Sequence, residues 1–317
     1  MLMIYSILLV AGSLVLLYFG ANWLVNGSSQ FALKLGISPL VIGLTIVALG
    51  TSSPELLVSL MASAEGKGGI AIGNVIGSNL FNLCVILSIA ALIRPLGIKM
   101  QVLKFDIPVV TLSTLLFGLF FLNRNLSQIE GLILFLFLIA YVIMNISLAR
   151  KEKSKEVLQE FADEMPVPGK KWFHLAGLVI GGLIVLLVGS KLLVEGASDI
   201  ARSLGVGETI IGLTIIAAGT SMPELATSAM AAFRKEYDIA VGNVIGSNIF
   251  NILGILGVSA LIKPISALAI SNIDLLALTV ATLVLYPFFR TRYTLKRDEA
   301  VFLILIYIVY MYYLWPK

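Results

Sequence analysis

Two copies of one short motif constrain this chain more than any other feature. Each copy places a proline and a glutamate inside an apolar stretch: GTSSPEL (Gly50 to Leu56) and, 169 residues later, GTSMPEL (Gly219 to Leu225). The same offset holds without a gap from position 24 to position 95 of the first copy, and a little over half of the paired positions are identical. The chain therefore contains an internal duplication, with one acid embedded in each half.

Composition places the chain in a membrane. Hydrophobic residues make up 59% and charged residues 13%, with a mean hydropathy of +1.01, so the chain cannot cover itself with a polar surface in water. A membrane-spanning helix needs about 20 apolar residues. The sequence predicts ten such helices, at approximately 2–25, 38–63, 70–93, 105–122, 128–148, 175–194, 207–233, 239–262, 271–290 and 299–315.

The position of the second copy predicts its orientation. Five predicted helices precede it, and a repeat that starts after an odd number of crossings enters the membrane upside down. We therefore predict an all-α integral membrane fold of ten transmembrane helices in two inverted-topology five-helix repeats, an architecture typical of secondary transporters. The halves are residues 1–149 and 175–317, and a polar linker at 150–174 joins them.

Basic residues are distributed unequally between the two sides of the predicted membrane. If successive loops alternate between the sides, 16 of the 22 Lys and Arg residues fall on the side of the linker. The positive-inside rule then puts the linker in the cytoplasm and both termini outside a multi-pass protein of the cell membrane. The net charge of +4 follows from this topology and does not indicate nucleic-acid binding.

Glu55 and Glu224 need a compensating charge. An ionised carboxylate at the middle of a bilayer is disfavoured by about 2.5 to 3.5 kcal/mol, and the Lys and Arg residues lie near the ends of the predicted helices. The compensating charge is then a bound cation or a proton. The alternative is a structural pair of protonated glutamates that bond between helices.

The prolines predict breaks beside both acids. Pro54 and Pro223 lack an amide hydrogen, so each frees a carbonyl oxygen four residues earlier and loosens the turn around Thr51 or Thr220. A simple kink without any ligand is the alternative. Thr51, Ser52 and Ser59 lie at helical spacing from Glu55, so we expect their hydroxyls to line that acid.

The helix after each motif carries a polar stripe. GNVIGSNLFN (Gly73 to Asn82) and GNVIGSNIFN (Gly242 to Asn251) repeat three polar residues at intervals of four. Such stripes also bond helices together in membranes, and this role is expected for Asn74, Asn79, Asn243 and Asn248. Ion ligation is expected for Ser78, Asn82, Ser247 and Asn251.

These groups are all hard oxygen donors, which suit Ca²⁺ and similar cations. The only histidine, His174, and the only cysteine, Cys84, supply no core ligands for zinc or copper. Two carboxylates balance one Ca²⁺ or two Na⁺, so the two ions would alternate as transported species and no resident cofactor is expected.

Two further patterns have structural interpretations. Asp106, Glu130, Asp274 and Glu299 are expected to open helices, where the helix dipole favours a negative charge. Glycines repeat along one face of the first and sixth predicted helices, which indicates close helix packing, a smooth sliding surface, or both. These glycines are Gly12, Gly20, Gly27, Gly181, Gly189 and Gly196.

The two blocks from GTSSPEL to GSNLFN and from GTSMPEL to GSNIFN resemble the α-repeats of the sodium/calcium exchanger family, within the cation/Ca²⁺ antiporter superfamily. The resemblance implies four central sites that hold Ca²⁺ or Na⁺ in alternation, and first and sixth helices that slide across the other eight. It implies that both ions share Glu55 and Glu224. The other implied ligands are the backbone oxygens of Thr51 and Thr220, the flanking Na⁺ ligands Ser52, Ser221, Ser78 and Ser247 with the carbonyls of Ala48 and Ala217, and the central Asn82 and Asn251.

The leading functional hypothesis is therefore antiport of Na⁺ against Ca²⁺ by alternating access in the lipid bilayer, with no obligate protein partner implied. Asparagine at both central positions, where potassium-coupled relatives resemble an Asp-bearing pattern, indicates no K⁺ requirement. Coupling to H⁺ is the alternative, because two glutamates can also discharge by protonation. A passive cation channel is a remote alternative, and the absence of GxSxG, HExxH and P-loop motifs argues against an enzyme.

Overall fold

A computed structural model describes residues 2–151, 172–206, 215 and 217–314. Most of the predicted linker at 150–174 and the start of the predicted seventh helix lie outside the described residues. Helices are labelled α, and π-helical or 3-10 turns η. The first copy comprises α1 (Leu2–Leu35), α2 (Pro39–Ile42), η1 (Gly43–Val47), α3 (Ala48–Thr51), α4 (Ser53–Ala64), α5 (Gly68–Phe81), η2 (Asn82–Ile86), α6 (Leu87–Ile93), β1 (Leu96–Gly97), η3 (Val102–Asp106), α7 (Ile107–Phe120), η4 (Phe121–Asn123), β2 (Asn125–Leu126) and α8 (Gln128–Lys151).

The described part of the second copy follows a similar order, without elements equivalent to η3 and η4. Its described elements are α10 (Trp172–Ser203), α12 (Ala217–Thr220), α13 (Met222–Phe233), α14 (Tyr237–Ile249), η6 (Phe250–Leu256), α15 (Gly257–Ile262), β3 (Ile265–Ser266), α16 (Asn272–Arg290), β4 (Thr294–Leu295) and α17 (Arg297–Leu314).

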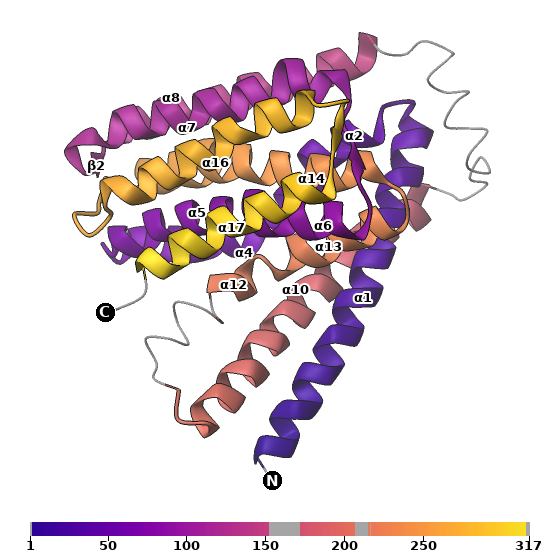
Figure 1. The fold of residues 1–317 in the computed structure, drawn as a ribbon, viewed down its shortest axis with the longest axis horizontal. Helices are drawn as coiled ribbons and strands as arrows, with labels where there is room; N and C mark the ends of the chain where they lie inside the picture. Colours follow the sequence, from indigo (N-terminus) through magenta and orange to yellow (C-terminus); the bar gives the residue numbers. More distant parts are fainter. Residues whose placement is uncertain (1, 152–171, 207–214, 216, 315–317) are drawn as a thin grey trace.

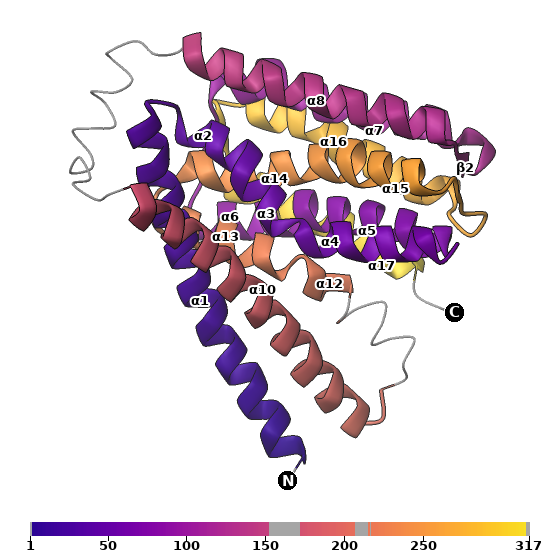
Figure 2. The same cartoon turned by 180° about the vertical axis from the view of Figure 1, so that it is seen from behind.

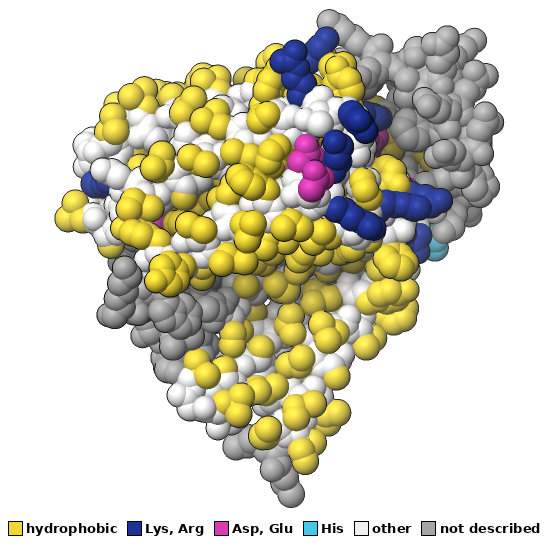
Figure 3. Space-filling view, viewed as in Figure 1, with side chains coloured by type: hydrophobic (Ala, Val, Ile, Leu, Met, Phe, Trp, Pro, Cys, Tyr) yellow, Lys and Arg dark blue, Asp and Glu magenta, His cyan; other side chains and the backbone are white. Residues whose placement is uncertain are grey.

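Within the described residues, seven helical spans are long and apolar enough to cross a membrane. An eighth is formed if Pro39–Thr51 and Ser53–Ala64, which meet at a 48° bend, count as one span. The bend lies at Ser52, two residues before Pro54, so the predicted break beside Glu55 is confirmed. Hydrophobic side chains cover most of the face in Figure 3, and Lys and Arg side chains gather toward its upper right. The protein is an all-helical, multi-pass membrane protein.

Two spans form the centre of the molecule. Over an 18-residue segment of each span, 67% of the residues are buried in Gly68–Ile93 and 78% in Tyr237–Ile262. The corresponding share in the other five spans is 22% to 39%. These are the spans that carry the two polar stripes. Their position explains why asparagines occur in helices that are otherwise apolar, because side chains at the centre face protein and not lipid.

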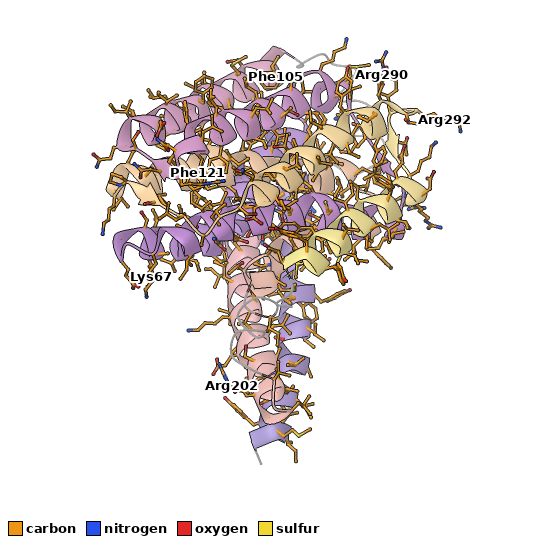
Figure 4. The ribbon with its side chains drawn as sticks, turned by 60° about the vertical axis from the view of Figure 1, so that its left-hand side comes forward. Lys67, Phe105, Phe121, Arg202, Arg290 and Arg292 are labelled. Carbon is orange, nitrogen blue, oxygen red and sulfur yellow. The ribbon has the colours of Figure 1, made fainter. Side chains whose placement is uncertain are left out.

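The N-terminal part of α1 and the C-terminal part of α10 project together from the remaining helices, while both helices also pack against α13 (Figures 1 and 2). Figure 4 shows this pair crossing the other helices at a steep angle, with Arg202 near its far end. Both helices are longer than the predicted 2–25 and 175–194. Polar residues around the predicted end of the first helix are bonded to the second copy: Arg234 donates to Asn22 and Asn26, and Ser29 donates to Glu236.

Glycines let α1 and α10 approach closely. A Cβ on Gly20 would lie 2.8 Å from the backbone nitrogen of Leu186, and one on Gly196 would lie 2.9 Å from the backbone oxygen of Ser6. Gly27 and Gly189 also face the partner helix. The predicted packing is confirmed for these four glycines. It is wrong for Gly12 and Gly181, where an added Cβ would meet nothing within 4 Å.

Short strands join the two copies at their loops. Strand β1 pairs antiparallel with β4, and β2 pairs antiparallel with β3. Each pair takes one strand from each copy. The two pairs are equivalent under the 169-residue offset, which relates β1 to β3 and β2 to β4: Leu96 pairs with Leu295, and Leu126 pairs with Ile265. The loops therefore hold the copies against each other outside the apolar spans.

Three of the four acids that were expected to open helices do so. Glu130 accepts from Ser127, Asp274 accepts from Ser271, and Glu299 accepts from the backbone of Lys296. The prediction for Asp106 is wrong. Its helix has already begun with the π-helical turn η3, and the fully buried Asp106 accepts a 2.9 Å hydrogen bond from the hydroxyl of Tyr141 on α8.

Candidate functional site

The two motif glutamates are fully buried and begin equivalent short helices. Glu55 lies in the first turn of α4 and Glu224 in the first turn of α13. Ser52 and Ser221 precede these helices with non-helical backbone angles (φ −79°, ψ 9° and φ −91°, ψ 11°), because the prolines cannot continue the preceding helices. Each carboxylate therefore lies at the positive end of a helix dipole.

Each glutamate is bonded by the other copy. The Ser52 hydroxyl donates to Glu224 Oε1 at 2.9 Å, and the Ser221 hydroxyl donates to Glu55 Oε1 at 2.8 Å. The expectation that Ser52 lines Glu55 on its own helix is wrong, since the break at Pro54 interrupts the helical spacing. These reciprocal bonds bring the two carboxylates together at the contact between the copies.

The polar stripes fix the backbone around each acid. Asn74 Nδ2 donates to the backbone oxygen of Glu55 and to Ser59, at 3.1 and 2.9 Å. Asn243 Nδ2 makes the equivalent bonds to Glu224 and Ser228, at 3.4 and 2.9 Å. Asn243 also accepts from the Thr51 hydroxyl at 3.0 Å. The expected helix-bonding role of Asn74 and Asn243 is confirmed. Ser228 was missed, although its offset from Ser59 is the repeat offset.

A second set of amide bonds crosses the centre. Asn79 Nδ2 donates to the backbone oxygen of Asn248 at 3.3 Å, and Asn251 Nδ2 donates to Asn79 Oδ1 at 2.9 Å. The helix-bonding role expected of Asn79 is thus confirmed. Asn82 begins the π-helical turn η2, and Asn251 lies in η6. Such turns displace side chains from the regular α-helical positions and are frequent at functional sites.

Several buried oxygens at this centre have no hydrogen-bond partner among the described residues. They include the second oxygens of both glutamates and the side-chain oxygens of three asparagines: Glu55 Oε2, Glu224 Oε2, Asn82 Oδ1, Asn248 Oδ1 and Asn251 Oδ1. A buried polar atom without a partner costs about 1 to 3 kcal/mol, and more when it is charged. Three ion pairs between described residues lie elsewhere, at Glu65, Asp238 and Asp199. A hard cation coordinated by oxygen would satisfy these atoms.

The remaining predicted residues lie on the same helices. Ser247, on α14, donates to the backbone oxygen of Ala48 at 3.5 Å. Ser78 is buried on α5. Thr220 ends the short helix α12, which begins at Ala217, just before the break at Pro223.

Helix α10 supplies a hydroxyl that sequence reasoning missed. Ser190 Oγ donates to the backbone oxygen of Gly219 at 2.6 Å, which is the carbonyl freed by Pro223. The equivalent residue in the first copy is Ala21, so the repeat gave no signal for this contact. The motif glycines let α10 lie against the breaks, since a Cβ on Gly50 would lie 2.6 Å from the Leu183 side chain.

Comparisons with known proteins place the chain in a family. The model of the sodium/calcium exchanger protein family matches residues 5–147 and 174–315. The sodium/calcium exchanger MaX1 of Methanosarcina acetivorans is 35% identical over 345 residues, which cover 98% of each chain. The inner membrane protein YrbG of Escherichia coli is 37% identical over 267 residues, which cover 83% of this chain and 81% of that protein.

The fold is similar to a solved exchanger. The structure of the sodium-calcium exchanger NCX_Mj soaked with Na⁺ and Ca²⁺ superposes with a TM-score of 0.85, at 33% identity and 99% coverage of both chains. The family match includes both copies of the motif and both glutamates. On this evidence the chain belongs to the sodium/calcium exchanger family.

Proposed function

We propose that this protein exchanges Na⁺ for Ca²⁺ across the membrane by alternating access. The observation that carries the proposal is the pair Glu55 and Glu224, fully buried, held together by reciprocal serine bonds, and each left with one unpartnered oxygen. The pair supplies a charge of −2, which one Ca²⁺ or two Na⁺ neutralise. An empty site would bury two like charges together, which is unfavourable, so only loaded forms would reorient and the two ions would alternate.

The proposed ligand set follows the repeat. Glu55 and Glu224 would bind both ions, and Asn82 and Asn251 would face the middle with their unpartnered oxygens. The flanking Na⁺ sites would use four hydroxyls and the backbone oxygens beside the breaks: Ser52, Ser221, Ser78, Ser247, Ala48, Ala217, Thr51 and Thr220. The bond from Ser247 to Ala48 supports the flanking part of this assignment, because it brings two predicted donors into contact.

The proposed architecture is ten transmembrane helices in two inverted repeats, 1–149 and 175–317. The contacts of α1 with α10 support it, because Gly20 meets Leu186 while Gly196 meets Ser6, so the two helices run antiparallel. Equivalent helices run in opposite directions when the repeats are inverted. The glycine contacts hold α1 and α10 closely together, which supports movement of the two helices as one unit against the other eight.

The proposed orientation has both termini outside and the 150–174 linker in the cytoplasm. Figure 4 places Lys67 at one end of the helix stack and Arg290 and Arg292 at the other. The expected basic-rich side contains Arg290 and Arg292, and the other side contains Lys67. In intact cells, a thiol reagent that does not cross the membrane should label the variant Lys67→Cys and should not label Arg292→Cys. Arg292→Cys should label once the cells are opened. The opposite pattern would reverse the orientation.

The transport assay uses the purified chain in sealed vesicles loaded with Na⁺. On dilution into Na⁺-free buffer at constant pH, Ca²⁺ should accumulate, and accumulation should stop when the Na⁺ gradient is collapsed. Glu55→Gln serves as the inactive control in the same membrane. Uptake that follows a pH gradient and ignores Na⁺ would replace the proposal by H⁺-coupled antiport. Conductance without any counter-ion would replace it by a channel.

A further inference from the structure

A groove of about 530 Å³ lies between α1, α13 and the end of α6 at Ile93. Apolar side chains line it, with Tyr18 on α1 and Phe233 at the end of α13 both well exposed. Its small lining residues on α13 are Ala226 and Ala229. One charged residue, Arg234, lies at its end. The groove belongs to the surface of a membrane protein, so lipid is its immediate surroundings.

The groove depends on residues that differ between the two copies. At the repeat offset, Ala226 and Ala229 correspond to Leu57 and Leu60. Leucine at those positions would place larger apolar side chains where the groove lies. The charged residue at the end also differs, since Arg234 corresponds to Glu65. The second copy alone therefore combines an open apolar lining with a cation.

Arg234 retains charge and donors for a further partner. Its guanidinium donates to the neutral amide oxygens of Asn22 and Asn26 on α1, at 2.6 Å in the case of Asn26. Among the described residues, no acid forms an ion pair with Arg234. A guanidinium has five N–H donors, and these two bonds leave three. The amides also fix the side chain across the end of the groove.

An apolar groove does not hold water stably, and in a bilayer the abundant apolar occupant is an acyl chain. A cation at the end of such a groove favours a negatively charged headgroup. We propose that the groove binds one acyl chain of an anionic phospholipid whose headgroup phosphate pairs with Arg234. This site is separate from Glu55 and Glu224, so it stands or falls independently of the ion exchanged.

The test is lipid retention by the full chain. The protein is reconstituted in vesicles of equal phosphatidylglycerol and phosphatidylcholine, extracted gently, and examined by native mass spectrometry. Wild type should retain one phosphatidylglycerol, with a preference over phosphatidylcholine of about fivefold, the effect of one basic residue near an anionic headgroup. Ala226→Leu with Ala229→Leu, which copies the first repeat, should abolish retention. Arg234→Gln should remove the headgroup preference, and Arg234→Lys should keep it.

Two controls separate the groove from general lipid contact. Ala140→Leu adds the same side chain at an exposed position of α8, and Arg292→Gln removes an exposed arginine elsewhere; both should retain lipid as wild type does. Each variant is checked for folding by its melting temperature. Equal retention of the two lipids by wild type, or retention unchanged in the folded double-leucine variant, would overturn the proposal.

Discussion

The serine and asparagine bonds to the two glutamates recur in both copies, whereas the bonds at the outer ends of the same helices do not. Asn74 bonds Ser59 as Asn243 bonds Ser228, both at 2.9 Å. At the end of α13, by contrast, Glu236 accepts a bond from Ser29 of α1.

The equivalent loop of the first copy makes a different contact. The residues corresponding to Arg234 and Glu236 are Glu65 and Lys67, and these two pair with each other at 2.6 Å on an exposed surface. The difference separates two requirements. On the proposed function, the centre needs matching ligands from both copies, because one cation would have to satisfy two carboxylates. The ends are free to differ, and they attach α1 to the second copy in a way that has no counterpart on α10 within the described residues.

The largest expected effect tests the symmetry of the centre. Glu55→Gln and Glu224→Gln should each abolish Ca²⁺ binding, because removing one partner of a buried charge cluster costs about 3 to 5 kcal/mol, or over about 100-fold in affinity. Isothermal titration of each variant measures this loss. Glu65→Gln, the same change at an exposed acid, should bind as wild type. If only one of the two variants lost Ca²⁺ affinity, the two copies would not contribute equally to the centre.

The central asparagines should differ from each other. Asn251 donates to Asn79 and aspartate cannot, so Asn251→Asp should lower the free energy of unfolding by about 1 to 3 kcal/mol. Asn82 has no bond to lose among the described residues, so Asn82→Asp should chiefly change the competition between Na⁺ and Ca²⁺. Thermal unfolding and competition titrations measure the two effects. Unchanged competition curves for Asn82→Asp would remove that residue from the site.

Two tyrosines make a further matched pair. Tyr141 donates to Asp106 and Tyr310 to Asp274, at 2.9 and 3.0 Å. Asp274 also accepts from the backbone and hydroxyl of Ser271. The carboxylate of Asp106 has, within the part of the chain that the structure describes, only one further bond, at 3.5 Å from Asn145. Tyr141→Phe should therefore destabilise by about 2 kcal/mol, and Tyr310→Phe by less. Equal changes in melting temperature would contradict this reading of Asp106.

The smallest effect tests the attachment of α1. Ser29 donates to Glu236 at 3.0 Å, while the hydroxyl of its counterpart Ser198 is buried without a partner among the described residues. Ser29→Ala should cost about 1 kcal/mol of unfolding free energy, and Ser198→Ala should cost nothing or stabilise slightly. The melting temperatures of the two variants decide the matter. If only Ser198→Ala destabilised the protein, the serine that attaches its helix would be on α10 and not on α1.

The sequence predicted the site better than its internal connections. An exact repeat offset identified both glutamates and the stripe asparagines, because a duplicated polar residue in an apolar span needs a common cause. It could not predict that Ser52 bonds Glu224, because a proline break turns the helix axis by an angle that the spacing of residues does not specify. Ser190 was missed because its counterpart is alanine and the repeat carries no signal there.

The predicted lengths of the first and sixth helices were too short for a related reason. The ends of α1 and α10 are polar, and polarity was taken to end a membrane helix. In the structure, Asn26 and Ser29 bond to the loop after α13, so their helix continues through them. Asp106 was assigned to a helix start for its charge alone. Its burial depends on Tyr141, which lies on a different helix and cannot be paired with it by any local pattern.

The central claim is that one ion lies between the carboxylates of the two copies. Crystals soaked in Ca²⁺ without Na⁺, measured for anomalous scattering, test it directly. The account predicts a peak within about 2.3 to 2.6 Å of oxygens from both Glu55 and Glu224, and loss of that peak at high Na⁺. A peak bound by only one glutamate, or located away from both, would contradict it.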